Sequence, residues 1–431
     1  MRTEGDRFPR ESGGTPRESR RKDPRRDSPT RSGRSARSGP CRAPSGARPR
    51  GRCGVTGGPV LDTRALNRAT LARQLLLTRA DLSPRDAVAH LGGVQAQEPQ
   101  EPFIGLWSRL RAFDPGALSD LLVGRRLVRT HLMRRTVHLV TAEDVLARRA
   151  RHDAMLRQRT GGTYRRELAG VDPGELAAAG REVMADGEPR SMAELARAVA
   201  HRWPDVPHRA LGEMLVSALI PMAQLPPRGL WRTRAGVRNL PVAAWLGRDI
   251  DPPAPEGTDP VGEAMARGYL AAFGPAATAD LRAWSGLAGL PAAVAAIRDE
   301  LVSFRDARGR VLWDLPDAPR PDPDTPAPVR FLPAFDNAIL GYDDRTRIID
   351  DADRRLSVDG ARVVLVDGRV TATWTVERDG GGRDAPGTVT VTPLRRLSRA
   401  EREEVAEEGR TLAAFLSDGA DDRVRVADGP P

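Results

Sequence analysis

The chain has 431 residues, 39% hydrophobic content and a formal net charge of +10, enough for one large unit or two to three small domains. It contains no apolar run of membrane-spanning length and no signal-peptide core, so we expect a cytoplasmic protein with no membrane partner. The only cysteines are Cys41 and Cys53. This excludes a disulfide, a Cys-ligated zinc and an iron–sulfur cluster from the rest of the chain.

The positive charge lies at the N-terminus. Residues 1–54 hold 16 Arg and Lys against 6 Asp and Glu, an excess that equals the net charge of the whole chain. This segment is rich in Arg, Gly, Ser and Pro and poor in large apolar residues, so we predict a disordered head over residues 1–58. The head is either a nucleic-acid-binding tail or an extension outside the mechanism, such as one added by a misplaced start, and we favour the extension.

Lysine is almost absent. Lys22, in the head, is the only one. A lysine Schiff base is therefore excluded from the remainder of the chain, as are the lysines of phosphate-loop hydrolases and protein kinases.

After the head, apolar residues at helical spacing and cap residues predict several helices, followed by a hairpin. Helices followed by a β-hairpin are typical of a winged helix, a relative of the helix-turn-helix. The expected elements are helices over Leu66–Arg79, from Ser83 and Pro84 towards Gln95, over Phe103–Phe113 and from Asp114, then strands over Leu127–Thr130 and Thr136–Val140.

This pattern recurs twice, which predicts three tandem winged-helix units. The second has helices over Pro173–Ala185, Met192–Arg202 and Arg209–Ile220 and a hairpin over Leu225–Val237. The third has helices over Val261–Phe273, Thr278–Ser285 and Pro291–Glu300 and a hairpin with its tip at Asp306–Gly309.

From Val329 the sequence becomes richer in β-formers. The Asp367-Gly368 pair between two β-rich runs is a strong hairpin signal. A helix over Arg399–Leu416 follows, so we expect a β-rich, barrel-like lobe with a closing helix. The expected boundaries are 1–58 for the head, 59–165, 166–247 and 248–328 for the three units, and 329–431 for this lobe.

Gln95 and Gln97 form a Gln-x-Gln motif where the helix from Ser83 runs into a turn. In extended or turn geometry, residues two apart point the same way, so both amides face one side. An amide stays neutral at every pH and both donates and accepts hydrogen bonds, so a pair of amides is able to hold a water in place. Taken alone the motif is weak, and the alternative is a solvated helix end.

Three stretches together carry a resemblance to a known family. They are Val94–Gln97, the run Val128–Val140 with the sequence VRTHLMRRTVHLV, and Leu332–Asn337 followed by Leu340–Arg345. In this order they resemble the AlkZ/AlkX-type (YcaQ-like) winged-helix DNA glycosylases of bacteria, over roughly residues 60 to 416. One departure is Arg135, where the family often has Gly.

The resemblance implies an α+β fold, with three tandem winged-helix motifs in a C-shape joined to the β-rich lobe. It also implies a monofunctional DNA glycosylase that excises bulky N7-alkylated purines, including those in interstrand crosslinks, with Gln95 and Gln97 as the catalytic pair. The partner is then double-stranded DNA with alkylated purines, the protein is a monomer associated with the nucleoid, and no cofactor is needed.

A basic cluster on and beside the first predicted wing is expected to contact DNA phosphates. No metal site is expected, because the histidines lack nearby carboxylate or Cys partners and the Asp-rich turn at Asp336, Asp343 and Asp344 suits a structural role. The candidate DNA-binding residues are Arg125, Arg126, Arg129, Arg134, Arg135, His138, Arg345 and Arg347.

Two alternatives remain open. A non-catalytic winged-helix DNA-binding protein or regulator would use the same basic surface, with Gln95 and Gln97 as incidental polar residues. A nuclease, the weaker alternative, would need clustered carboxylates and a divalent metal.

Overall fold

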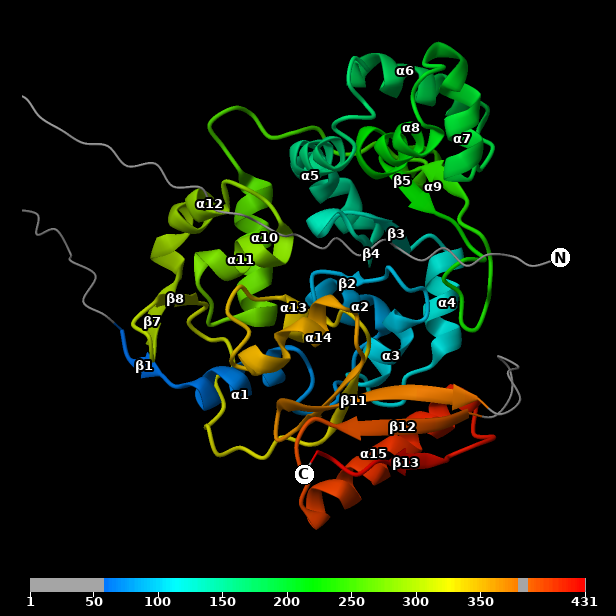
Figure 1. Cartoon of the computed structure of the whole chain (residues 1–431). Coiled ribbons are helices and arrows are strands. Elements are labelled where there is room, and N and C mark those ends of the chain that lie inside the picture. The colour runs from blue at the N-terminus through cyan, green and yellow to red at the C-terminus, as the bar shows by residue number, and fades with distance from the viewer. Residues whose placement is uncertain (1–57, 379–386, 431) are drawn as a thin grey trace, which may run out of the picture. The chain divides into compact units, whose positions relative to one another are not determined.

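The computed structural model describes residues 58–378 and 387–430, in a mixed α and β fold (Figure 1). The expected disordered head lies outside the described residues, apart from its last position. In the described part the strands form three sheets, one of three strands and two of five. No helix in this part is long and apolar enough to cross a membrane.

The first helices follow their sequence signals, with two shorter than expected. Asp62, Ser83 and Asp114 each cap a helix by accepting backbone N–H groups, which would otherwise lack partners. The expected helices over Leu66–Arg79 and Phe103–Phe113 end at Arg73 and Trp107. The elements are α1 (Thr63–Arg73), α2 (Pro84–His90), α3 (Glu101–Trp107) and α4 (Pro115–Val123).

One five-stranded sheet contains both the first and the second hairpin. Its order is β2 (Val94–Gln95), β4 (Val137–Thr141), β3 (Leu127–His131), β5 (Met222–Gln224) and β6 (Asn239–Pro241). All neighbours in it are antiparallel. Since β3 pairs with β5, the sheet crosses the boundary expected at residue 165, and the first hairpin lies inside a larger sheet.

A 22-residue helix, α5 (Ala142–Thr163), leads from this sheet into the second group of helices. The third group carries the short sheet in which β1 (Val60–Leu61) pairs with β7 and β7 with β8 (Val311–Asp314), and its tip is where the sequence predicted it. The other elements are α6 (Pro173–Val183), α7 (Met192–Val199), α8 (His208–Met214), α9 (Val242–Leu246), α10 (Pro260–Phe273), α11 (Thr278–Ser285), α12 (Leu290–Ala296) and β7 (Val302–Asp306).

The C-terminal lobe is an open sheet of five strands. The order is β13-β12-β11-β10-β9, and in the described residues β13 and β9 do not pair to close it, in contrast to the barrel-like lobe expected. The Asp367-Gly368 hairpin is confirmed, since both residues have positive φ, 47° and 78°. The elements are β9 (Arg330–Leu332), α13 (Asn337–Leu340), α14 (Arg354–Val358), β10 (Val363–Val366), β11 (Arg369–Arg378), β12 (Gly387–Pro393), α15 (Arg399–Ser417) and β13 (Val424–Val426).

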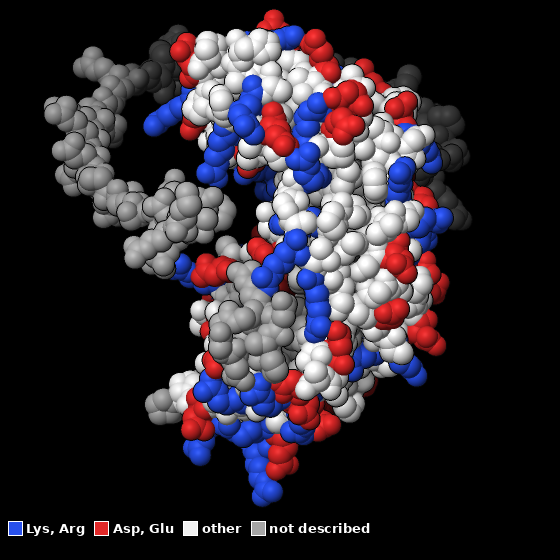
Figure 2. All heavy atoms as spheres, turned by 90° about the vertical axis from the view of Figure 1, so that its right-hand side faces the viewer, with Lys and Arg blue, Asp and Glu red and all other residues white. Residues whose placement is uncertain are grey.

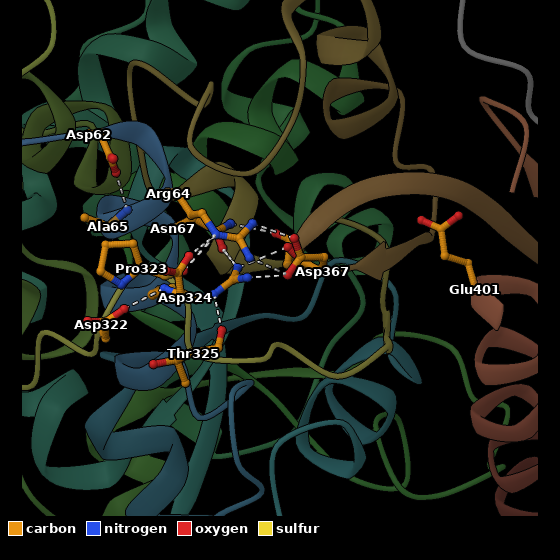
Figure 3. Close-up of polar contacts among 12 residues, drawn as sticks. Asp62, Arg64, Ala65, Asn67, Asp322, Pro323, Asp324, Thr325, Asp367 and Glu401 are labelled. Atoms are coloured by element: carbon orange, nitrogen blue, oxygen red, sulfur yellow. Dashed lines mark hydrogen bonds and ion pairs between the residues drawn. The ribbon is translucent and has the colours of Figure 1, made fainter. Parts of the chain in front are cut away.

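Polar contacts join α1 to this hairpin turn (Figure 3). Arg64 and Arg68 both form ion pairs with Asp367. The Asn67 amide donates to the carbonyl of Gly368 at 2.7 Å, and a Cβ at that glycine would lie 2.4 Å from Asn67 Oδ1. The turn therefore needs glycine for its close approach as well as for its backbone conformation. Elsewhere on the surface, basic and acidic side chains are interspersed (Figure 2).

Candidate functional site

Two glycines turn the chain from α2 into β2 and so place the Gln-x-Gln motif. Gly92 and Gly93 have φ of 69° and 98°, and a Cβ at Gly93 would lie 2.7 Å from a methyl group of Val140. Glycine is needed here both for conformation and for space. β2 then pairs with β4, with Gln95 opposite His138, so the motif begins on a strand at the edge of the shared sheet.

Both glutamine amides are held by the first hairpin through their oxygens. Gln95 is buried, and its Oε1 accepts a hydrogen bond from Arg134 Nη2 at 2.9 Å. Gln97 is exposed, and its Oε1 accepts from the backbone N–H of Val137 at 3.1 Å. Neither amide nitrogen has a hydrogen-bond partner among the described residues. The motif therefore presents N–H donors, rather than carbonyl oxygens, to whatever binds there.

Ala96, the residue between the two glutamines, is held by hydrogen bonds inside the protein. Ala96 is fully buried, its N–H donates to the carbonyl of Val137 at 2.8 Å, and its own carbonyl accepts from Arg129 Nη2 at 2.9 Å. Burial lowers the pKa of Arg129 to about 10, which leaves it charged at neutral pH. With 2% of its surface exposed, Arg129 supports the motif from inside the protein.

The hairpin turn between β3 and β4 has two residues in left-handed conformation. Arg134 and Arg135 have φ of 56° and 66°, and the N–H of Thr136 donates to the carbonyl of Met133 at 3.0 Å. This is a type I′ turn, in which glycine is favoured at the second central position. The turn keeps the backbone that a glycine would adopt, with arginine in its place.

Arg134 is the charged group that contacts the Gln95 side chain. It donates to Gln95 and to the carbonyl of Trp284, and it is half-buried. Burial, then the charges of Arg345 and Arg159, lower its pKa to about 10. It forms no ion pair with a carboxylate of the described residues.

The other candidate DNA-binding residues divide by exposure. Arg125 and Arg126 are exposed, and Arg125 also stacks on Trp245, 4.3 Å from the ring centroid. Arg135 and Arg345 are half-buried. His138 and Arg347 are 0% and 3% exposed, so both side chains lie in the interior of the protein.

The buried residues of this set have partners inside the protein. The His138 ring contacts the carbonyl of Thr136 through Nδ1 at 3.0 Å, and burial holds its pKa well below the usual value. Arg347 donates to the carbonyl of Pro275 at 3.0 Å and lies over the Tyr342 ring. Arg129, His138 and Arg347 thus have structural roles beneath the site.

The C-terminal motif Leu332–Asn337 reaches the same strand. The side chain of Asn337 donates to the carbonyl of Gly93 at 2.6 Å, two residues before Gln95. Asp336 forms a two-pronged ion pair with Arg109, with distances of 2.7 and 2.8 Å, and both side chains are buried. This motif therefore fixes the start of β2 from the other end of the chain.

The acidic turn has arginine partners. Besides the Asp336–Arg109 pair, Asp344 forms ion pairs with Arg308 and Arg310 at 3.0 and 2.8 Å. Within residues 58–378 and 387–430, no group of His, Cys, Asp or Glu side chains is arranged to hold a metal ion.

Residues that the sequence did not point to are Arg159 and the Trp284 carbonyl, which come from α5 and α11.

Comparison with known proteins defines the class of this protein as a DNA glycosylase. The family model described as "DNA glycosylase AlkZ-like" matches residues 88–415, and the chain belongs to this family. Its fold is similar to that of the DNA glycosylase AlkZ of Streptomyces sahachiroi, at 22% identity and a TM-score of 0.66, over 85% of this chain and all of that one. No curated protein sequence matches it.

Proposed function

We propose that this DNA glycosylase hydrolyses the N-glycosidic bond of bulky N7-alkylated purines in double-stranded DNA, including those in interstrand crosslinks, and that Gln95 and Gln97 position the attacking water. N7 alkylation makes the purine cationic, so the base leaves as a neutral molecule. A general acid, which an ordinary glycoside requires on its leaving oxygen, is then unnecessary. The remaining tasks are to place water and to stabilise an oxocarbenium-like sugar.

The observation that carries this proposal is that the oxygens of both amides are occupied by the first hairpin. Each Oε1 is occupied by a donor of the first hairpin, Arg134 for Gln95 and the Val137 N–H for Gln97. Each Nε2 is left to donate. A water that accepts one amide N–H keeps a second lone pair for attack on the anomeric carbon, and the proton that it loses on attack passes to solvent water. Because amides do not titrate, this arrangement holds over the whole working pH range.

The reaction ends at an abasic site in this proposal. Strand cleavage after base excision needs an amine that forms a Schiff base with the sugar. The sequence has no lysine after Lys22, and the described residues contain none. The enzyme is therefore monofunctional in our proposal, and it acts as a monomer.

We propose that the three helix-and-hairpin groups are winged-helix units in tandem and that the exposed and half-buried arginines near the first hairpin contact the DNA backbone. These are Arg125, Arg126, Arg134, Arg135 and Arg345. Guanidinium groups suit phosphates because their forked donors match two phosphate oxygens.

The test is base release from a duplex with a single N7-methylguanine, under single-turnover conditions. Gln95→Ala and Gln97→Ala should each slow release by about a hundredfold, the usual effect of losing one preorganised hydrogen-bond group. The double variant should be only slightly slower than either single variant, because both residues place one water. Melting temperature and duplex affinity should stay near wild type.

Gln100→Ala is the matched control. The Gln100 amide also makes two hydrogen bonds, to Leu230 and Arg232, but these hold the loop between β5 and β6. Its rate should stay within a few-fold of wild type. A wild-type rate in the Gln95→Ala/Gln97→Ala double variant would refute the catalytic assignment. Release that stops in EDTA would require a metal, which the proposed mechanism does not use.

A further inference from the structure

Arg134 has hydrogen-bonding capacity that the protein leaves unused. A guanidinium has five N–H donors. Arg134 uses one on Nη1 for the Trp284 carbonyl and one on Nη2 for Gln95 Oε1. The other three donors have no partner among the described residues, although the residue is half-buried. A half-buried guanidinium with unused donors is well suited to bind an anion such as a phosphate.

Two more arginines, Arg159 and Arg345, lie near Arg134. Arg159, from the exposed side of α5, donates to the Arg134 carbonyl at 3.3 Å. A Cβ at Gly286 would lie 3.2 Å from the Arg134 backbone and 3.3 Å from Arg159 Nη2, so both arginines pack against the same glycine. Arg345 is held by Ser357 at 2.7 Å, and its charge contributes to the lowered pKa of Arg134.

None of the three forms an ion pair with a carboxylate of the described chain, whereas other arginines of the interior do. Arg73 is paired with Asp314 and Arg109 with Asp336. Positive charge on Arg134, which contacts Gln95, and on the two arginines near it is a disadvantage for the reaction itself, because the sugar and the alkylated base are cationic in the transition state. At a distance of a few ångström, each such charge raises the barrier unless an anion screens it.

We propose that Arg134, Arg159 and Arg345 together bind one phosphodiester group of the DNA backbone next to the lesion, and that Arg134 couples this phosphate to the orientation of Gln95. The inference rests on the proposed function. The phosphate neutralises the cluster only when DNA is bound. Arg134 then bridges three fixed points, the phosphate, the Trp284 carbonyl and Gln95 Oε1, and so acts as a positioning residue for the amide.

The phosphate is located by replacing single phosphates around N7-methylguanine, one at a time, with neutral methylphosphonates. Wild-type affinity, measured by fluorescence anisotropy, should fall about tenfold at one position, the typical effect of losing a charged hydrogen bond. The Arg159→Ala/Arg345→Ala variant should already bind about tenfold more weakly, and the same methylphosphonate should then cost it little further affinity. Equal losses in both proteins at every position would overturn the proposal.

Arg399→Ala/Arg410→Ala is the charge-matched control. Both side chains are exposed on α15, outside the site, and both have only glutamate partners on their own helix. This variant should keep wild-type affinity and the full methylphosphonate effect. If it lost the effect as well, the response would report net charge, and the proposed site would be wrong.

Arg134→Lys separates positioning from charge. Lysine keeps the positive charge but lacks the fork that bridges three acceptors. Affinity should stay within a few-fold, while the maximal single-turnover rate falls at least tenfold. A wild-type rate would exclude the positioning role. If wild-type protein released no base, the proposed function would fail, and the anisotropy experiment would still decide whether the phosphate site exists.

Discussion

Removing the charge of Asp336 should strongly destabilise the protein. Asp336 and Arg109 form a two-pronged ion pair, and their side chains are 3% and 2% exposed. Asp336 also caps α13 by accepting the N–H of Ala338 at 2.8 Å. Asp336→Asn preserves the shape of the side chain and an acceptor for that N–H, but it leaves a buried guanidinium without its counter-charge. The free energy of unfolding should fall by about 3–5 kcal/mol.

Urea unfolding followed by tryptophan fluorescence measures this loss. The decisive comparison is the double variant Arg109→Met/Asp336→Asn, in which neither charge remains. Its loss of unfolding free energy should be clearly smaller than the sum of the losses of Arg109→Met and Asp336→Asn alone, because the second substitution removes the uncompensated charge. Additive losses, or an Asp336→Asn variant within about 1 kcal/mol of wild type, would refute this account. Glu403→Gln, which breaks an exposed ion pair with Arg399, should barely change stability.

Two further predictions concern the first hairpin and the helix behind it. Arg135→Gly should raise the free energy of unfolding by about 1 kcal/mol in the same urea experiment, because φ of 66° costs arginine energy that glycine does not pay; a less stable variant would contradict this. His152 is fully buried, and burial is the main cause that lowers its pKa to about 3. Below about pH 6.5 the unfolded chain therefore binds a proton that the folded chain does not, so the free energy of unfolding decreases as the pH is lowered. His152→Asn should make this fall shallower by about 1.4 kcal/mol per pH unit between about pH 6 and pH 4, and an unchanged slope would show that His152 titrates normally.

Local signals in the sequence predicted the local structure well. Ser83 and Asp114 start helices, and Asp367-Gly368 makes a hairpin turn, because each signal acts within three or four residues of itself. Helix ends were less predictable. The apolar stripe of α1 continues to Leu76, but Leu75 adopts φ of 58°, and the N–H of Leu76 turns back to the Leu71 carbonyl. A stripe of apolar residues is equally compatible with a helix that continues to Leu76 and with a chain that leaves the helix before Leu75.

Non-local features were beyond the sequence. The long helix α5 is rich in arginine and has a sparse apolar face, so its periodicity is weak. The burial of Arg129 and Arg347 was also not predictable, because it depends on hydrogen bonds to the backbone carbonyls of distant segments, those of Ala96 and Pro275. The Gln95 and Gln97 motif was visible in the sequence. The hydrogen-bond donors that orient it were harder to predict, because Arg134 and the Val137 N–H are distant from the motif in sequence and come close only in the folded sheet.

The sheet shared by the first two hairpins has a consequence for how this chain can be divided. In it β3 has β4 on one side and β5 on the other, with Thr130 opposite Ala223. A fragment that stops at residue 165 would leave β3 with an open edge, a template for pairing with other chains. The hairpin that orients the glutamines is thus completed by the pairing of Thr130 with Ala223 and of Arg129 with Gln224, much later in the chain. The segment up to residue 165 is therefore not a portable module, and moving it alone between relatives should give aggregating proteins unless β5 and β6 are moved with the first hairpin.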